Sequence, residues 1–269
     1  MSTVVFVHAH PDDEAIATGG TMASLAADGH RVVLVTATVG ELGEIPEGML
    51  NDGESLADRR VVELAEAGRI LGVARQAFLG YHDSGMAGEE SNQRRGSFAA
   101  ADVEEAANRL AKILDEEHAD VVVIYDEHGG YGHPDHVQVH TVGVRAAEIA
   151  GTPRVFMATM DRGFLQSLAE QASQGGEEGW SPPEDTAADM QTMGEPSSRI
   201  TTEVDVTKRI DAKRDAMRAH ATQISEESFF LAMPPEVFEM VWGHEWYIRI
   251  RPEAPNPYPG PRETSLLGG

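Results

Sequence analysis

Short apolar runs alternate with helix-like segments along this chain of 269 residues. Residues 4–7, 32–35 and 121–125 are rich in Val and Ile and are short enough to be buried strands. The segments between these runs carry the apolar spacing of amphipathic helices. A helix that joins two strands of one sheet makes those strands parallel, and such crossovers are right-handed. The alternation therefore predicts an α/β fold with a mostly parallel sheet and helices on both of its faces.

Residues that favour helix ends indicate where the predicted helices begin. Ser55 and Asp102 stand directly before helical patterns, where a side-chain oxygen can accept a backbone N–H. Thr207 has the same position later in the chain, and Pro134 suits the first turn of a helix. The predicted helices are 21–28, 56–71, 103–117, 134–150 and 207–220, and the further predicted strands are 77–79, 154–159, 200–206 and 247–250. The fully apolar run 121–125 is expected to be the central strand.

The amino-acid composition of the chain changes after residue 173. Residues 174–198 are rich in Gly, Glu, Pro and Ser with little periodicity, which predicts a variable loop or lid. Residues 200–206 then alternate apolar and polar side chains, as a half-buried or edge strand does. This loop would divide the chain. We predict a Rossmann-like core of residues 1–173 before it and, after it, a smaller C-terminal α/β portion of residues 199–251 that completes the same domain. Residues 252–269 are predicted to form an irregular tail.

The charge balance narrows the choice of partners. The chain has 21 Lys and Arg against 45 Asp and Glu, a formal net charge of −24, which repels nucleic acid and anionic lipid. We therefore expect a small-molecule substrate, and neither nucleic acid nor a membrane as partner. Because the chain has no Cys, a metal ion would have to bind His, Asp or Glu. Without a basic and apolar leader or a membrane-length apolar run, we expect a soluble cytoplasmic protein.

Two polar clusters follow two of the predicted strands. Residues 8–14 follow the first strand, and residues 125–136 follow the predicted central strand. Pro11 and Pro134 restrict the residues before them, His10 and His133, to extended conformations, so each imidazole projects from a stiff turn. Ligand sites of open α/β sheets form at the carboxyl ends of strands, and imidazole with carboxylate suits a divalent metal such as zinc. The two clusters therefore predict one site.

The clusters contain motifs that resemble a known family. His10-Pro11-Asp12-Asp13-Glu14 and His133-Pro134-Asp135-His136 resemble the signature pair of the LmbE-like zinc-dependent de-N-acetylases, the family of N-acetylglucosaminyl-phosphatidylinositol de-N-acetylase. The chain is also similar to the actinobacterial mycothiol branch, its deacetylase and its S-conjugate amidase, in these segments: 7–14, 38–44, 83–88, 125–140 and 218–223. Residues 174–198 do not correspond to that branch.

The resemblance implies a hydrolase that removes an N-acetyl group from an N-acetylglucosaminyl conjugate of the inositol type. Four other activities stay open at this point. The same metal could cleave the larger amide of a mycothiol S-conjugate, deacylate a secondary metabolite, or hydrate a substrate on the same scaffold. A sugar-binding module without turnover is the alternative that is not an enzyme.

The resemblance also implies a ligand set. It assigns zinc to His10, Asp13 and His136, with an open position for water. Iron(II), cobalt or manganese could bind the same donors. His140, one helical turn after His136, is either a supporting partner of a ligand or a packing residue, and His8 carries no pattern beyond that of an ordinary polar residue.

Four residues carry the implied chemistry. Asp12 would be the general base that takes a proton from the attacking water. His133 would face the developing oxyanion or protonate the leaving amine, and Asp135 would orient that imidazole and raise its pKa. The residues leave open whether Asp12 or His133 is the acid. Tyr131 either swings toward the tetrahedral intermediate or only covers the core.

The resemblance suggests weaker assignments around the substrate. Glu44, Arg60 and Asp83 are placed near the sugar hydroxyls, to which charged groups give directional hydrogen bonds. Glu14 is expected to cap the next helix or to support a ligand. His220 is assigned to structure near the site.

Overall fold

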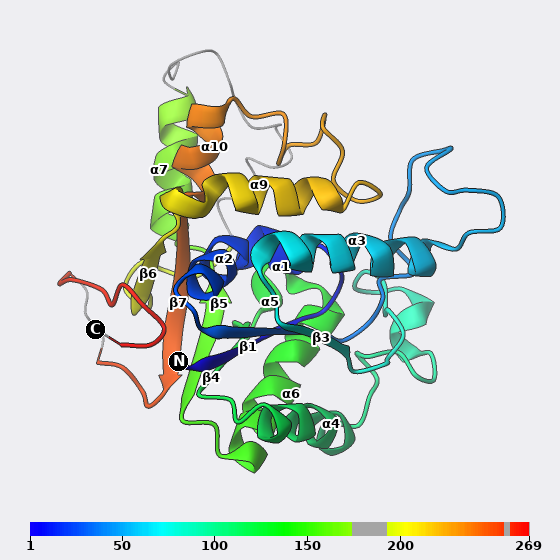
Figure 1. The fold of residues 1–269 in the computed structure, drawn as a ribbon, viewed down its shortest axis with the longest axis horizontal. Helices are drawn as coiled ribbons and strands as arrows, with labels where there is room; N and C mark the ends of the chain where they lie inside the picture. Colours follow the sequence, from blue (N-terminus) through cyan, green and yellow to red (C-terminus); the bar gives the residue numbers. More distant parts are fainter. Residues whose placement is uncertain (174–192, 256–258, 269) are drawn as a thin grey trace.

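The computed structural model describes residues 1–173, 193–255 and 259–268, and in that part of the chain helices cover both faces of a seven-stranded sheet (Figure 1). The strands are β1 (Thr3–His8), β2 (Arg31–Thr36), β3 (Arg75–Phe78), β4 (Val121–Tyr125), β5 (Arg154–Thr159), β6 (Thr202–Asp205) and β7 (His244–Arg251). The helices are α1 (Asp13–Ala17), α2 (Gly19–Ala27), α3 (Leu56–Leu71), α4 (Val103–Glu116), α5 (Gly129–Gly132), α6 (Pro134–Ala150), α7 (Arg162–Ser173), α9 (Ile210–Ala219) and α10 (Pro235–Trp242), with 3-10 turns η1 (Glu90–Gln93) and η3 (Thr207–Arg209).

The strand order explains where a site can form. The order is β3-β2-β1-β4-β5-β7-β6, and the first five of these strands are parallel, whereas β7 and β6 are antiparallel to their neighbours. The chain runs outward from β1 through β2 to β3, then returns to β4 and runs outward on the other side. The segments after β1 and β4 therefore leave the sheet at the point where the direction reverses, where ligands bind in sheets of this kind.

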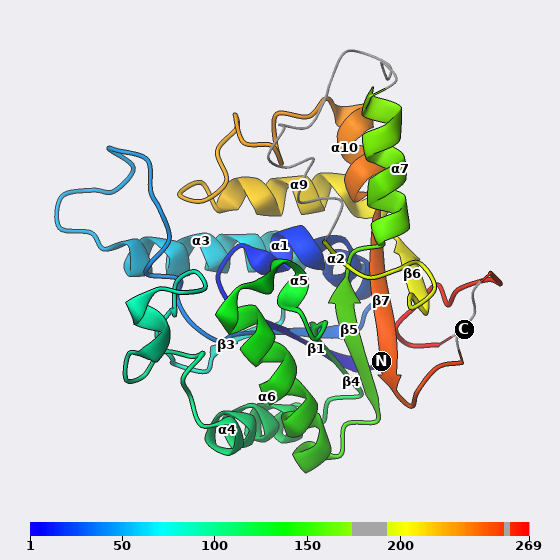
Figure 2. The same ribbon diagram turned by 180° about the vertical axis from the view of Figure 1, so that it is seen from behind.

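Alternate residues of the strands enter apolar cores on opposite faces. Val4 and Phe6 contribute to the core that α2, α3, α9 and α10 cover, whereas Val5 and Val7 contribute to the core that α4 and α6 cover. Figures 1 and 2 show these two groups of helices on opposite sides of the sheet. Each fully buried side chain of this size stabilises the fold by about 1.5–3 kcal/mol, so the strand ends that carry the site are rigidly held.

Several predicted helix boundaries are confirmed. The Ser55 hydroxyl accepts the N–H of Asp58 at 3.1 Å, and Gly72 ends α3 at a φ of 75°. The Asp102 carboxylate accepts the N–H of Glu105 at 2.9 Å. Helix α6 begins at Pro134, and β4 is the middle strand of the sheet, as predicted.

Other boundaries differ from the prediction. The helical stretch predicted over 21–28 is α2, which begins two residues earlier, and a separate short helix that was not predicted, α1, begins at Asp13 inside the polar cluster. Thr207 does not cap a helix: its N–H and hydroxyl both donate to the Asp205 carboxylate, which ends β6 and starts η3. Strand β7 is longer than the predicted 247–250 because it pairs with β5 on one side and β6 on the other. Helices α7 and α10 were not predicted, and α10 has only eight residues.

Most of the predicted loop 174–198 lies outside the described residues, since the structure describes only its residues 193–198. The proposed division of the chain into core, loop, C-terminal portion and tail stays a prediction. Where the chain is described, we find no helix that combines the length and the apolar character needed to cross a bilayer.

A buried ion pair joins the C-terminal elements to the first helices. Lys213 of α9 donates to Glu245 of β7 at 2.6 Å, and both side chains are buried. The same carboxylate accepts the N–H groups of Gly20 and Thr21 at 2.9 and 2.8 Å. Glu245 thus satisfies donors at the N-terminus of α2, where the helix dipole favours a negative charge.

Candidate metal centre

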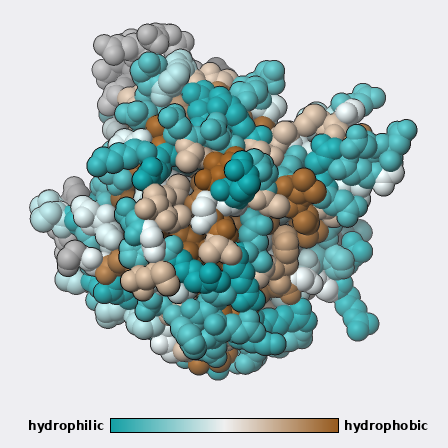
Figure 3. All heavy atoms as spheres, in the orientation of Figure 1, coloured by the Kyte–Doolittle hydropathy of each residue, from teal (hydrophilic) through white to brown (hydrophobic). Residues whose placement is uncertain are grey.

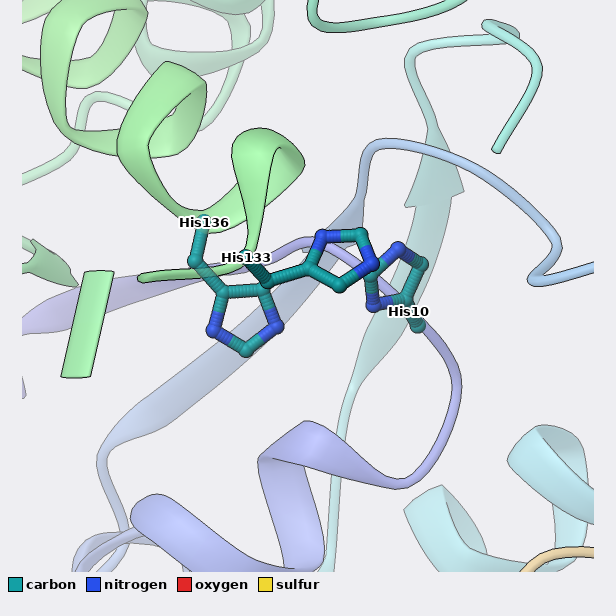
Figure 4. Close-up of side chains that lie close together, drawn as sticks. All are labelled: His10, His133 and His136. Carbon is teal, nitrogen blue, oxygen red and sulfur yellow. The ribbon is translucent and has the colours of Figure 1, made fainter. Parts of the chain in front are cut away.

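The candidate site lies between two turns at adjacent strand ends. We call residues 9–14, which follow β1, the β1 turn, and residues 126–136, which follow β4, the β4 turn. Figure 4 shows the imidazole of His10, from the β1 turn, beside those of His133 and His136, from the β4 turn. The ring centroid of His10 lies 4.6 Å from that of His133 and 5.4 Å from that of His136. The two sequence clusters therefore meet, as predicted.

The three predicted ligands converge. Asp13 Oδ2 lies 3.3 Å from His136 Nε2 and 3.5 Å from His10 Nδ1. His136 Nε2 is buried and has no hydrogen-bond partner, which is costly unless a cation or another partner satisfies it. The second nitrogen of His10, Nε2, lies 3.1 Å from Asp135 Oδ2, and metal-binding histidines usually have such a carboxylate partner. The donor set therefore fits a divalent ion.

The imidazoles around Asp13 favour the ionised form of its carboxylate, which a metal requires. Burial alone would raise the pKa of Asp13, but the nearby imidazoles of His136 and His10 outweigh it and hold that pKa well below its usual range. Metal ligands must be deprotonated, so Asp13 is ready to bind.

Among the described residues, the compact donor groups at this site contain His133 and do not contain Asp13. The imidazoles of His10, His133 and His136 have ligand atoms within 4.8 Å of one another, and so do His10, Asp83, His133 and Asp135. His133 Nδ1 already accepts the N–H of Asp135 at 3.1 Å, so only its Nε2 is available to an ion or a substrate. Geometry alone leaves His133 as close to the centre as Asp13.

Asp12 has an unusual backbone. Its φ of 117° lies in a region that L residues rarely adopt, and such strain is typical of functional positions. Its carboxylate lies 3.2 Å from Nη2 of Arg60. Burial raises the pKa of Asp12 to about 6, although Arg60 opposes the shift, and Asp13 adds to it. A carboxylate with a pKa near the working pH suits proton transfer.

Arg60 lines the cavity and also contacts protein groups. Its guanidinium donates to the carbonyl of Gly40 at 2.7 Å and to the carbonyl of Pro11, and the residue is buried. Gly40 has a φ of 66°, and a Cβ there would lie 2.4 Å from Arg60 Nη1, so the guanidinium needs a glycine at this position. Arg60 thus supports Asp12 and the β1 turn, and its predicted contact with a sugar stays a prediction.

Asp135 does not orient His133 as predicted. Its carboxylate accepts from the N–H and hydroxyl of Ser84 and lies beside His10, while only its backbone N–H reaches the His133 ring. Burial, together with the neighbouring imidazoles of His10 and His136, lowers the pKa of His133 to about 4, although Asp135 opposes the shift. His133 is thus neutral, with its proton on Nε2, rather than the raised-pKa imidazole that was expected.

The site opens into a cavity of about 570 Å³. Asp83 is buried in its wall, accepts the N–H groups of Gly85 and Leu42, and lies 3.5 Å from His10 Nε2. Glu44 lies exposed at the rim, and Tyr131 is 53% exposed with its ring 4.9 Å from that of His136. All three predicted residues therefore line the cavity. Figure 3 shows one face of the molecule, mostly hydrophilic, with hydrophobic atoms gathered near its middle.

Sequence reasoning missed two supports of the site. His8 bonds to the Tyr125 hydroxyl at 2.7 Å and to Thr18 at 2.9 Å, and the Tyr125 ring stacks on His136 at 4.5 Å. His140 bonds to the carbonyl of Tyr125 at 3.0 Å, so it supports the strand end rather than a ligand directly. No local sequence pattern predicts the contact of His8 with Tyr125, because the two residues are 117 positions apart.

The second missed support is a contact between Glu14 and His220. The two side chains meet at 2.5 Å across 206 positions, and the other oxygen of Glu14 accepts the N–H of Asp12 at 3.0 Å. Of the two roles expected for Glu14, support of the site is the one that the structure shows.

Comparison with known proteins decides the family. The model of the family described as "PIG-L: GlcNAc-PI de-N-acetylase" matches residues 5–147. The chain belongs to this family. It is 41% identical over 294 residues to the 1D-myo-inositol 2-acetamido-2-deoxy-alpha-D-glucopyranoside deacetylase of Streptomyces avermitilis, covering 99% of this chain and 96% of the relative. It is 40% identical over 270 residues to deacetylase 1 of that name from Catenulispora acidiphila, covering 92% and 83%.

Solved structures share the fold of this chain. The N,N'-diacetylchitobiose deacetylase of Pyrococcus horikoshii matches with a TM-score of 0.57 and 20% identity, covering 92% of this chain and 83% of that one. The 4-carboxy-2-hydroxymuconate hydratase of Pseudomonas putida matches with a TM-score of 0.56 and 19% identity, covering 95% and 98%. One fold therefore carries amide hydrolysis and hydration, so the reaction has to be argued from the site.

Proposed function

We propose that this protein is a metal-dependent hydrolase that removes the N-acetyl group from an N-acetylglucosaminyl-inositol conjugate. One observation carries the proposal: His10, Asp13 and His136 converge beside Asp12, a carboxylate that is free of the ligand set. The names of the relatives support the same substrate class, since they describe deacetylases of an inositol-linked 2-acetamido sugar.

The proposed metal is zinc, held by His10, Asp13 and His136. When bound, such an ion activates a water molecule as nucleophile and polarises the amide carbonyl. The two imidazoles and one carboxylate also suit iron(II), and which of them binds in the cell depends on availability as well as affinity.

Asp12 is the proposed general base. Its pKa of about 6 leaves it ionised at neutral pH, so it can accept a proton from the attacking water. Arg60 holds the carboxylate in place through a contact of 3.2 Å and the carbonyls of Gly40 and Pro11 hold Arg60. The orientation of the base is thus fixed before the substrate arrives.

The protonation state of His133 bears on the two roles that the sequence left open for it, contact with the oxyanion and protonation of the leaving amine. A neutral imidazole with its proton on Nε2 is a hydrogen-bond donor and a poor acid. We therefore assign His133 to the developing oxyanion, and the proton that Asp12 has accepted to the leaving amine. We also assign a second donor to the oxyanion to Tyr131, which lines the cavity and is 53% exposed.

The cavity supports a substrate of two rings. Its volume of about 570 Å³ falls in the range of about 300–1000 Å³ typical of small-molecule sites. Glu44 and Asp83 line it as acceptors for sugar or inositol hydroxyls, the role that the resemblance suggested for them.

One observation favours a second candidate, the amidase that cleaves a mycothiol S-conjugate. Beyond the metal site the cavity is lined by aromatic and Met side chains, among them Phe230, Trp242, Trp246 and Met160. An acetyl group needs far less apolar surface than these residues offer, whereas an acyl-cysteine with a thiol substituent could use it.

Product analysis distinguishes these activities. We expect the metal-loaded protein to release acetate from N-acetylglucosaminyl-inositol faster than from N-acetylglucosamine, and to lose this activity with a chelator and regain it with zinc or iron(II). Release of an N-acetylcysteine conjugate from a mycothiol adduct at a higher kcat/KM would favour the amidase. If the metal-loaded protein hydrolyses neither substrate, the proposal is wrong.

A further inference from the structure

The pair formed by Glu14 and His220 is the least expected feature of the site. Glu14 opens α1 directly after the ligand Asp13, and His220 ends α9 near the other end of the chain. Their side chains are both fully buried, and His220 Nε2 lies 2.5 Å from Glu14 Oε1. A buried carboxylate is costly without partners, so this contact fixes which way Glu14 points.

The second oxygen of Glu14 reaches the general base. Glu14 Oε2 accepts the backbone N–H of Asp12 at 3.0 Å, and Asp12 is the residue with the rare φ of 117°. Strain of this kind costs on the order of 1–3 kcal/mol and persists only where surrounding contacts enforce it. Glu14 is the side chain that bonds to the N–H of this strained residue.

We infer that His220 is a positioning residue for the reaction: through Glu14 it holds the backbone of Asp12 in the conformation that points the base at the attacking water. The inference rests on the proposed function, because it takes Asp12 as the general base. Without the imidazole, Glu14 loses its buried partner and turns or takes up a proton, and the N–H of Asp12 loses its acceptor. The carboxylate of Asp12 then moves away from its working position.

A neighbouring contact provides the comparison that such an inference needs. Two residues further along, Thr222 donates its backbone N–H and its hydroxyl to Glu63 of α3 at 3.0 and 2.7 Å. This contact also ties the segment after α9 to the rest of the domain through a buried carboxylate. Neither of these hydrogen bonds reaches Asp12, and the hydroxyl also accepts from Gln223 at 3.3 Å. Loss of the Thr222 contact should therefore lower stability while Asp12 keeps its conformation.

The test uses three variants of the full-length, metal-loaded protein. His220→Leu removes the donor, His220→Gln replaces it with an amide N–H of similar reach, and Thr222→Val removes the matched hydroxyl contact. For His220→Leu we expect kcat for acetate release to fall about 10- to 100-fold, as a misplaced catalytic group does, while KM changes by less than about twofold and metal content is unchanged. His220→Gln should regain most of the lost kcat.

The control sets apart positioning from general stabilisation. Thr222→Val should lower the melting temperature while kcat stays within about twofold of wild type. A crystal structure of His220→Leu should show Asp12 with a negative φ and no contact to Glu14. The inference is overturned if kcat of His220→Leu stays at the wild-type level, or if Thr222→Val lowers kcat equally. Absence of wild-type turnover would refute the proposed function, whereas the φ of Asp12 in His220→Leu tests the inference without any assay.

Discussion

The two turns that form the metal centre are held in different ways. The β1 turn depends on distant side chains: Arg60 of α3 fixes the carboxylate of Asp12, and His220 after α9 supports the same residue through Glu14. The β4 turn also has distant partners, since Ser84 bonds to Asp135 and Thr159 to Asp126, but its glycine segment 128–132 is held by Asp126 of the same turn. Its shape comes from glycines with positive φ, and His133 caps α6 by accepting a backbone N–H two residues later.

This difference follows from what each turn must do. The β1 turn holds the base in a strained conformation, and local sequence cannot supply the forces that keep it there. The β4 turn only has to present two imidazoles close to a helix start, which glycines and an N-cap achieve locally. Changes in the β1 turn should therefore affect the rate most, and changes in the β4 turn should affect the rate less and the stability of the turn more.

The largest effect is expected for the base of the β1 turn. Asp12→Asn keeps the shape of the side chain and tolerates the positive φ, but it cannot accept a proton. We expect kcat to fall about 10²- to 10⁴-fold with metal content unchanged, measured by acetate release and elemental analysis. If more than a tenth of the wild-type rate survives, Asp12 is not the base.

The β4 turn should show a smaller loss of rate. His133→Asn retains an N-cap side chain while it removes the Nε2 donor. We expect kcat to fall about 10²- to 10³-fold, as when one oxyanion donor is lost, with little change in metal content. Loss of the metal in this variant would instead make His133 a ligand and contradict our assignment.

Metal removal should affect the two turns unequally. An ion present at about 100 times its Kd stabilises the folded state by about 2.7 kcal/mol, so a chelator should lower the melting temperature. In hydrogen exchange we expect faster exchange in residues 128–132 than in residues 9–14 after chelation, because the N–H groups of His128 and Gly130 bond to Asp126 of the same turn, whereas distant side chains support Asp12. If chelation accelerates hydrogen exchange equally in both turns, the two turns are not held in different ways.

The smallest effect concerns a glycine of the β4 turn. Gly129 has a φ of 64°, and a Cβ there would lie 2.6 Å from the Cβ of His136. Gly132 has a φ of 88° with no atom within 4 Å of such a Cβ. We expect urea unfolding to show a loss of about 1–3 kcal/mol for Gly129→Ala and a smaller loss for Gly132→Ala. If the two losses match, the contact with His136 does not shape the turn.

Local signals in the sequence predicted much of the fold. Ser55, Asp102 and Pro134 each act on groups a few residues away, so their helices appear where the pattern placed them. The prediction that Thr207 caps a helix was wrong, because Asp205, two residues earlier, accepts its N–H and its hydroxyl. The short α10 gives little periodicity of its own and is stabilised by burial of side chains such as Phe238 and Trp242.

The site was predictable to the extent that its motifs are contiguous. The proposed ligands His10, Asp13 and His136 lie in two short segments whose strands are neighbours, so their meeting follows from the topology. Their supports do not follow from it. The partners of Glu14 and Asp135 are His220 and Ser84, and a contact that spans 51 or 206 positions leaves no periodic trace in the sequence.

The buried pair of Lys213 and Glu245 has a consequence for anyone who redesigns this protein. Replacing Lys213 alone would leave the charge of Glu245 unpaired in the interior, at a cost of about 3–5 kcal/mol. An apolar pair would leave the N–H groups of Gly20 and Thr21 without their acceptor. The two positions lie on different elements, α9 and β7, so a chimaera that exchanges one of them between relatives must exchange the other as well. Any library aimed at the cavity wall should vary Lys213 and Glu245 jointly.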